Sequence, residues 1–287
     1  MPWGIFMKLS KTTLALGLSC LLGVGLAQAQ QVGPNPTSSQ LNATSGPFAV
    51  GQTSVSSFVS GFGGGTIYYP TASGTYGVIA VCPGYTGTSS SISWFARRLA
   101  THGFVTIAMN TNTIFDQPDS RATQLRSALN YMVNSSSVRS RINGNVRGVA
   151  GHSMGGGGTL IASASDSTLK VGIPMTPWNL STLQFYSIRV PQMIFGADGD
   201  TIAPYAVHAL PFYNAVPSST KKGYALLNGA THFTPNGTDE RIGRYGVAFA
   251  KRFAYNDTRY STFLTGSEHA SYNNFLRFDT FMQNGPY

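Results

Sequence analysis

The sequence predicts an α/β protein in which helices cover both faces of one mostly parallel sheet. Segments with strand character alternate with segments of helical spacing from residue 66 to residue 254. Such alternation is typical of a sheet built through right-handed crossovers. The chain has 287 residues, of which 42% are hydrophobic and only 10% are charged. This size and composition suit one large domain with a substantial core, which we assign to residues 30–287.

The expected strands are short apolar segments. Several are continuously apolar rather than alternating, which is typical of strands that are buried on both faces of a parallel sheet. We expect strands over residues 66–69, 76–81, 104–109, 146–150, 170–175, 191–195 and 222–227.

Helices are expected where apolar residues recur at helical spacing. Ile92, Phe95 and Leu99 share one face of a segment that stops at Gly103. Asp119 is a candidate N-cap for a following helix. The full set of expected helices covers residues 91–100, 120–133, 154–164, 204–215 and 239–254. Residues 31–45 are polar and rich in Pro, Asn and Ser, so we expect an extended entry segment there.

The first 29 residues have the layout of a secretory signal peptide. Lys8 and Lys11 precede an apolar run over residues 14–26, and Ala27-Gln28-Ala29 offers a small-residue cleavage site. The run is short for a bilayer span, which makes a membrane anchor the weaker alternative. We therefore expect residues 1–29 to be removed and the mature protein to be secreted, to the extracellular space or the periplasm.

Charge and cysteine content restrict the possible partners. The net charge of +9 falls to +7 (9 − 2) once Lys8 and Lys11 leave with the signal peptide. The basic residues are scattered and form no nucleic-acid footprint, so we expect a solvated basic surface and no nucleic-acid partner. Cys82 is the only cysteine of the mature chain and is expected to be a small buried hydrophobe.

The pentapeptide Gly151-His152-Ser153-Met154-Gly155 is the most informative stretch of the chain. It has the form G-x-S-x-G and falls where an expected strand turns into an expected helix. This turn strains the serine and lifts its hydroxyl clear of the sheet, and a Cβ at either glycine would collide with the neighbouring strand or helix. The glycines continue to Gly158, which indicates close packing of the helix; no Lys-Ser or Lys-Thr follows, so a phosphate loop is excluded.

A nucleophilic serine needs a base and an acid that orients the base. In α/β-hydrolases the chain order is Ser, then Asp or Glu, then His. Asp198 and Asp200 both follow the strand over residues 191–195, and spacing alone does not decide between them. His232 follows the next strand in a short glycine-led loop and is the expected base.

The other histidines fit the role of the base less well. His102 ends an expected helix, where a cationic side chain favours the helix dipole. His152 is adjacent to the nucleophile and is expected to point away from it. His208 is expected on a helix, and His269 lies in the C-terminal tail.

An oxyanion formed at Ser153 needs two rigid N–H donors. One is the backbone N–H of Met154, and the other should come from the turn Pro83-Gly84-Tyr85-Thr86-Gly87, with Tyr85 as the expected donor. The sequence has no Cys/His metal spacing and no dinucleotide fingerprint, so we expect no metal and no cofactor.

With these motifs in order, the sequence resembles the bacterial cutinases and polyester hydrolases, including the poly(ethylene terephthalate) hydrolases, of the α/β-hydrolase superfamily. The resemblance covers nearly all of the mature chain. It includes Gly33-Pro34-Asn35-Pro36-Thr37, Pro83-Gly84-Tyr85-Thr86, Asp116-Gln117-Pro118, the serine motif, Pro177-Trp178, Asp200-Thr201-Ile202-Ala203-Pro204 and residues 256–263.

The resemblance implies a triad of Ser153, Asp200 and His232, with an oxyanion hole from the N–H groups of Tyr85 and Met154. It also implies an open cleft in which the substrate contacts Tyr85, Thr86, Met154, Trp178, Ile202 and Phe233. The intervals of 47 positions from Ser153 to Asp200 (200 − 153) and 32 positions from Asp200 to His232 (232 − 200) leave no room for a large lid. Bulky side chains at His208 and Phe233 are expected to restrict the rotation of Trp178. The C-terminal disulfide that is usual in the family is absent here, because Ala197 and Leu264 stand where cysteines might be expected.

The sequence therefore predicts a secreted, monomeric serine carboxylic ester hydrolase that cleaves polyesters such as cutin, aliphatic polyesters and poly(ethylene terephthalate). A triacylglycerol lipase or a general short-chain carboxylesterase is the alternative with the same chemistry. A binding module with a vestigial triad is the alternative from another class, and it would not react at Ser153.

Overall fold

A nine-stranded sheet organises the computed structural model, which describes residues 1–4 and 30–287. The predicted signal peptide falls almost wholly on residues 5–29, outside the described residues. The strands are β1 (Val50–Val55), β2 (Gly65–Pro70), β3 (Tyr76–Cys82), β4 (Phe104–Met109), β5 (Ile142–His152), β6 (Val171–Met175), β7 (Gln192–Ala197), β8 (Lys222–Leu227) and β9 (Phe278–Gln283).

The order across the sheet is β1-β2-β4-β3-β5-β6-β7-β8-β9. From β4 to β8 all neighbours are parallel, whereas β1, β2 and β9 run antiparallel to their neighbours at the two edges. The sheet is thus mostly parallel, as predicted. Because parallel neighbours end at the same edge, the loops after β3, β5, β7 and β8 meet along one rim.

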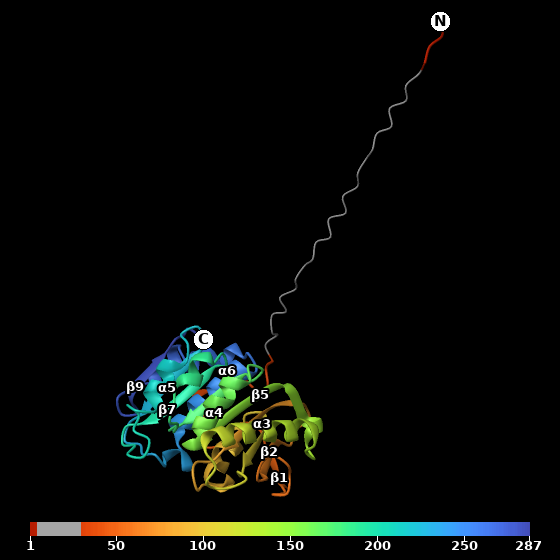
Figure 1. The fold of residues 1–287 in the computed structure, drawn as a ribbon. Coiled ribbons are helices and arrows are strands. Elements are labelled where there is room, and N and C mark those ends of the chain that lie inside the picture. The colour runs from red at the N-terminus through yellow and green to blue at the C-terminus, as the bar shows by residue number, and fades with distance from the viewer. Residues whose placement is uncertain (5–29) are drawn as a thin grey trace.

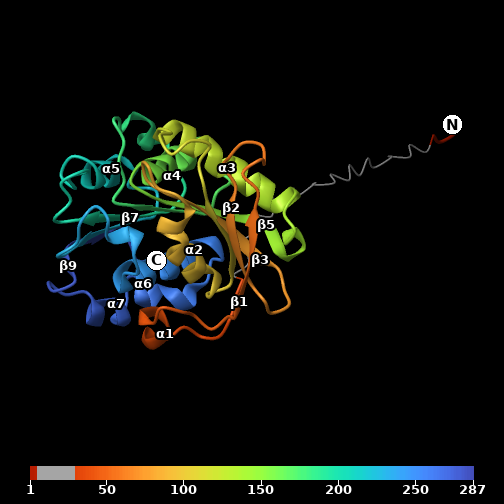
Figure 2. The same cartoon turned by 90° about the horizontal axis from the view of Figure 1, so that it is seen from below.

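Helices cover both faces of this sheet, with α3, α4 and α5 on one side and α1, α2, α6 and α7 on the other (Figures 1 and 2). The α-helices are α1 (Ser38–Asn42), α2 (Ser93–Ala100), α3 (Pro118–Asn134), α4 (Met154–Ser165), α5 (Ala209–Ala215), α6 (Glu240–Ala254) and α7 (Ser267–Tyr272). Short 3₁₀ turns cover Ser89–Ile92, Arg139–Arg141, Leu183–Ser187, Thr234–Asn236 and Thr258–Phe263. This arrangement is an α/β-hydrolase fold.

The core lies in two layers, one on each face of the sheet. Side chains of α2 and α6 pack on one face, and those of α3 and α4 pack on the other. Every residue of β3, β4, β7 and β8 is buried, which confirms that their mostly apolar sequences reflect burial on both faces. Cys82 ends β3 as a buried free thiol, as expected.

The structure corrects several element predictions. The edge strands β1 and β9 were missed, since both contain exposed polar residues and pair on one side only. Residues 31–45 contain the short helix α1, which Thr37 caps. The predicted helix 204–215 begins only at Ala209, after a turn. Asp119 lies in the first turn of α3 and is not its cap, because Gln117 holds that position and Pro118 follows it.

The expected solvated basic surface is wrong for several cations. Arg98, Arg121, Arg244 and Lys251 are buried. Each donates hydrogen bonds to oxygen atoms of the folded chain, and Lys251 Nζ donates to the carbonyls of Val32 at 2.6 Å and His102 at 3.1 Å. These cations therefore tie segments of the fold together, because hydrogen bonds replace the water that burial removes.

His102 follows the end of α2, where a cationic side chain would favour the helix dipole, but its imidazole is not cationic in the folded protein. The side chain is buried just beyond α2. Burial, and then the charges of Arg98 and Lys251, hold the pKa of His102 well below its usual range. The folded protein therefore keeps this imidazole neutral, whereas the unfolded chain protonates it below a pH of about 6.5.

This difference predicts that His102 contributes to acid destabilisation. Because the unfolded state alone binds the proton, the free energy of unfolding falls as the pH decreases below about 6.5, by about 1.4 kcal/mol per pH unit for this one group. We expect the slope of unfolding free energy against pH between 6.5 and 5 to decrease by about that amount in His102→Gln. Urea unfolding at a series of pH values measures the slope, and an unchanged slope would contradict the assignment.

Candidate active site

Ser153 occupies the junction between β5 and α4, and its backbone is strained. Its φ of 54° and ψ of −118° lie in a region that non-glycine residues rarely adopt. A Cβ on Gly151 would lie 2.3 Å from the carbonyl oxygen of Gly155, and one on Gly155 would lie 2.4 Å from that of Pro83. Both glycines are therefore required for the close approach of β5, α4 and the end of β3, as the sequence predicted.

The glycine run beyond Gly155 also has a packing role. A Cβ on Gly157 would lie 2.2 Å from the carbonyl oxygen of Trp178, and one on Gly158 would lie 3.0 Å from Cβ of Arg121 in α3. The run thus allows α3 and the loop after β6 to approach α4 closely, in addition to the close contact between α4 and the sheet.

Three side chains from the ends of β5, β7 and β8 form one hydrogen-bonded chain. His232 Nε2 lies 2.8 Å from Ser153 Oγ, and His232 Nδ1 lies 2.8 Å from Asp200 Oδ2. All three residues are buried. With the proton on Nδ1, the imidazole donates to the carboxylate and accepts from the serine hydroxyl, which is the arrangement that makes the hydroxyl nucleophilic.

Asp200, and not Asp198, is the acid that contacts His232. Burial by itself would raise the pKa of Asp200, but hydrogen bonds from His232 and from the backbone N–H groups of Ala203 and Ile202 outweigh it and lower the pKa. The carboxylate is therefore charged near neutral pH. It can hold the imidazole in one tautomer and stabilise the imidazolium form.

Asp198 instead fixes the loop that carries the histidine. Its carboxylate accepts backbone N–H groups from Gly199, Gly229 and Ala230 at 2.8–3.0 Å. These bonds connect the loop after β7 to the loop after β8. Spacing in the sequence did not decide between Asp198 and Asp200. In the structure Asp200 contacts the imidazole of His232, whereas Asp198 binds the backbone of the loop that carries His232.

His152 lies against His232 and supports it. Its Nε2 lies 2.8 Å from the carbonyl oxygen of His232, and the two ring centroids are 5.0 Å apart. Burial, and then the neighbouring His232, lower the pKa of His152 to about 4. Because His152 is neutral near pH 7, it can donate to this carbonyl without placing a charge beside His232.

The loop after β3 lies against Ser153. A Cβ on Gly84 would be 3.0 Å from Cβ of Ser153. Thr86 has a φ of 58°, and its backbone N–H donates to the carbonyl of Ile114 at 2.8 Å. Tyr85 is thereby fixed between two restrained neighbours. Met154 opens α4, where the first N–H groups have no partner within the helix.

Arg121 holds this loop and was missed as a site residue. Its fully buried guanidinium donates to the carbonyls of Pro83 at 3.0 Å, Ile114 at 3.0 Å and Asp116 at 2.7 Å. The arginine thus connects the Tyr85 loop to the loop that precedes α3. The Asp116-Gln117-Pro118 motif was visible in the sequence, but nothing there showed that an arginine three residues later points inward.

A pocket of about 250 Å³ opens above Ser153. Tyr85, Thr86, Ile202 and Phe233 lie among its lining residues together with Ser153 and His232. Tyr85, Ile202 and Phe233 are each about half exposed, at 47%, 50% and 59%. Four of the predicted substrate contacts therefore meet at one open pocket.

Trp178 lies outside the lining of this pocket. Its backbone N–H donates to the carbonyl of Ser153 at 2.9 Å, while its ring is 6.0 Å from that of His208. The predicted contact of His208 with Trp178 is thus present. Phe233 packs on the rings of His232 and His152 instead, so the prediction that it restricts Trp178 receives no support from the ring contacts of the described residues.

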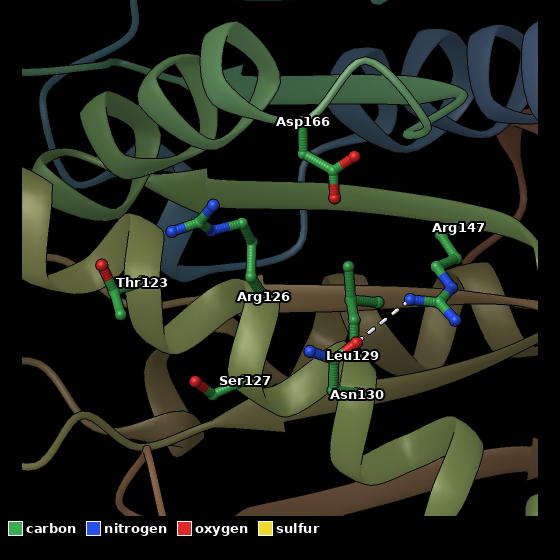
Figure 3. A pocket seen from close by; sticks show the side chains of 7 residues that line it. All are labelled: Thr123, Arg126, Ser127, Leu129, Asn130, Arg147 and Asp166. Carbon is green, nitrogen blue, oxygen red and sulfur yellow. Dashed lines mark hydrogen bonds between the residues drawn. The ribbon is translucent and has the colours of Figure 1, made fainter.

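A separate hollow of about 270 Å³ lies between α3, β5 and the far end of α4 (Figure 3). Arg126, Arg147 and Asp166 line it, and Arg147 donates to Asn130 at 3.1 Å. It contains neither Ser153 nor His232, so it is not the site of their chemistry.

Within residues 1–4 and 30–287, no three His, Cys, Asp or Glu side chains are grouped as a metal site, and no helix is long and apolar enough to cross a membrane.

The α/β-hydrolase fold with Ser153, His232 and Asp200 in one hydrogen-bonded chain is an arrangement typical of serine hydrolases, and the relatives below are ester hydrolases by name. The chain belongs to the PET hydrolase-like family, whose model matches residues 25–284. It is 56% identical over 242 residues to "Cutinase 1" of Thermobifida cellulosilytica, covering 83% of this chain and 92% of that protein. It is 52% identical over 262 residues to "Cutinase cut1" of Thermobifida fusca, covering 90% and 82%.

A further relative is "Bis(hydroxyethyl) terephthalate hydrolase" of Streptomyces coelicolor. It is 48% identical over 271 residues, which cover 91% of this chain and 87% of the relative. The matches therefore extend over nearly the whole of both proteins in each comparison.

Because the backbone at the end of β3 lies so close to Gly155, we predict that adding one methyl group there strongly destabilises the protein. In Gly155→Ala the new Cβ meets backbone oxygen atoms that cannot move freely, so we expect a loss of several kcal/mol in unfolding free energy and loss of esterase activity. Urea unfolding and hydrolysis of a soluble ester measure the two effects. Gly243→Ala in α6 is the matched control, because its Cβ would meet only Arg98 Nε at 3.4 Å.

The control gains helix propensity without a clash, by up to about 1 kcal/mol. Equal stability of the two alanine variants would show that the backbone contact at Gly155 is not restrictive.

Proposed function

We propose that the chain is a secreted polyester hydrolase in which Ser153, His232 and Asp200 are the catalytic residues. The hydrogen-bonded chain from the hydroxyl to the carboxylate, with both contacts at 2.8 Å, is the observation that carries the proposal. In this proposal His232 is the base and Asp200 orients it, and both Ser153 and His232 line the pocket that opens beside them.

In the acylation step, Ser153 Oγ attacks the carbonyl carbon of the ester while His232 Nε2 takes the hydroxyl proton. The carbonyl oxygen becomes an oxyanion, which accepts hydrogen bonds from the backbone N–H groups of Tyr85 and Met154. The bond to the alcohol oxygen then breaks, and His232 donates its proton to the departing alcohol. Asp200 stabilises the imidazolium between these two transfers.

In the deacylation step, water replaces the alcohol. His232 takes a proton from the water as its oxygen attacks the acyl carbon, and the proton then returns to Ser153 Oγ as the acyl–serine bond breaks. The products are an acid and an alcohol. The atoms and charges balance without oxidation or reduction, and the side chain of His232, supported by Asp200, mediates every proton transfer in these steps.

The open pocket supports a polymeric substrate. Tyr85, Ile202 and Phe233 present large half-exposed apolar surfaces beside Ser153, and an extended chain can lie across them without passing under a lid. By their names, one relative acts on cutin and another on the diester bis(hydroxyethyl) terephthalate. Together with Met154, Thr86 and Trp178, these residues are our proposed substrate contacts.

We further propose that residues 1–29 are a signal peptide and that residues 30–287 form one catalytic domain, which is secreted and monomeric. The basic leader followed by an apolar run supports the first part. The single sheet that spans Val50 to Gln283 supports the second. N-terminal sequencing of the secreted protein and its mass in solution test these two parts.

The proposed roles predict distinct losses on substitution. We expect Ser153→Ala to abolish ester hydrolysis and labelling by a serine-directed phosphonate, because the nucleophile is gone. Asp200→Asn should keep the fold but lower kcat by about 10⁴-fold, since the tautomer is no longer held. Initial rates on a soluble ester and mass spectrometry of the labelled protein measure both. A Ser153→Ala variant that hydrolyses esters would refute the triad.

The substrate class is tested separately from the triad. We expect release of soluble acids from aliphatic and aromatic polyester films to exceed hydrolysis of a triacylglycerol emulsion at equal enzyme, because the half-exposed side chains of Tyr85, Ile202 and Phe233 offer an extended chain an open apolar surface. Product analysis by liquid chromatography measures the films, and titration of released acid measures the emulsion. The reverse order would favour the lipase alternative.

A further inference from the structure

Beside Trp178 lies a second hollow, with a volume of about 500 Å³. Its lining residues are Trp178, Asn179, Leu180, Ser181, Thr182, Val207, His208 and Phe212. Both of its walls continue directly from the site at Ser153. One wall begins at Trp178, whose N–H donates to the Ser153 carbonyl, and the other follows Asp200 and Ile202 along the same loop.

The rim of this hollow exposes large apolar side chains. Leu180 is 86% exposed on one wall and Val207 is 64% exposed on the other. Leu183 and Tyr186 continue the apolar surface along the first segment, at 80% and 60%. Exposed apolar side chains that gather next to a reactive site mark a surface that a ligand covers.

The hollow is preformed. Asn179 Nδ2 donates to the carbonyl of Ser181 at 2.8 Å and thereby fixes the turn. The buried ring of Phe185 packs edge-on against Phe212 at 5.1 Å, and His208 packs on Phe212 at 5.6 Å. A ligand that binds here therefore does not have to order these walls, which reduces the entropic cost of binding.

The lining is uncharged. It contains no Asp, Glu, Lys or Arg, and its polar side chains are those of Asn179, Ser181, Thr182 and His208 together with the indole N–H of Trp178. Burial lowers the pKa of His208, so its imidazole is neutral near pH 7. Apolar walls with neutral hydrogen-bond donors suit a chain of apolar units joined by ester carbonyls. The hollow in Figure 3, which arginines line, has the opposite character.

We propose that a polyester chain whose scissile ester lies at Ser153 continues past Trp178 into this hollow, which binds the next repeat unit. Leu180 and Val207 contact the apolar part of that unit, and the hydroxyl groups of Ser181 and Thr182 donate to its carbonyls. This inference rests on the proposed function and adds a binding site for a repeat unit that does not react.

The test compares soluble oligoesters of one and three repeats, made from the same acid and alcohol. We expect the unsubstituted enzyme to have a higher kcat/KM on the longer ester. The double variant Leu180→Ser, Val207→Ser should lose about tenfold of kcat/KM on the three-repeat ester, mainly through KM, and less than twofold on the one-repeat ester. Val207→Trp, which fills the hollow, should give the same selective loss.

Phe58→Ser is the matched control. Phe58 is 97% exposed in the turn after β1 and lies in neither lining, so both kcat/KM values should remain unchanged. Thermal unfolding of each variant checks that the fold is intact, and Val207→Trp keeps the test valid if the double variant does not fold.

Three results would overturn the inference. The first is an equal kcat/KM of the unsubstituted enzyme on the one-repeat and three-repeat esters. The second is an equal loss of kcat/KM on both esters in the double variant and in Val207→Trp. The third is a loss in Phe58→Ser as large as the loss in those variants. Ser153→Ala, assayed on the same two esters, tests the proposed function separately, because hydrolysis that persists in this variant would refute the triad whatever the dependence on ester length.

Discussion

The strained backbone of Ser153 is the constraint on which the rest of the structure depends. A non-glycine residue at a φ of 54° costs free energy, and the surrounding contacts have to offset that cost. Gly151 and Gly155 remove the side chains that would separate β5, α4 and the end of β3. The parallel sheet then brings the loops after β7 and β8 to the same rim, where His232 contacts the hydroxyl of Ser153 and Asp200 contacts His232.

Backbone hydrogen bonds hold the parts of this rim together. Arg121 binds three carbonyls from two loops, Asp198 binds three N–H groups from two others, and His152 binds the main chain of His232. None of the three contacts the serine hydroxyl through a hydrogen bond among those described. They restrict the loops that carry the reacting groups, and such restriction lowers the reorganisation that the reaction requires.

Much of the fold was predictable because burial leaves a direct trace in the sequence. The strands β3, β4, β7 and β8 are buried on both faces and read as apolar runs. The edge strands β1 and β9 pair on one side and carry exposed polar residues, so no such trace exists for them. The basic residues were misjudged for a related reason. A sequence reports that Arg121 or Arg244 is charged, but not that carbonyls or other oxygen atoms surround it.

The sequence by itself determined the order of serine, acid and histidine, the glycines at the turn and the alternation of strands and helices, because these are local patterns. From the residues alone, only the tertiary structure decided between Asp198 and Asp200, since both follow β7 and only the distance to His232 separates them. It also placed Arg121 beneath the Tyr85 loop and Trp178 between two hollows. Such contacts join segments that are far apart in the chain, so no local pattern encodes them.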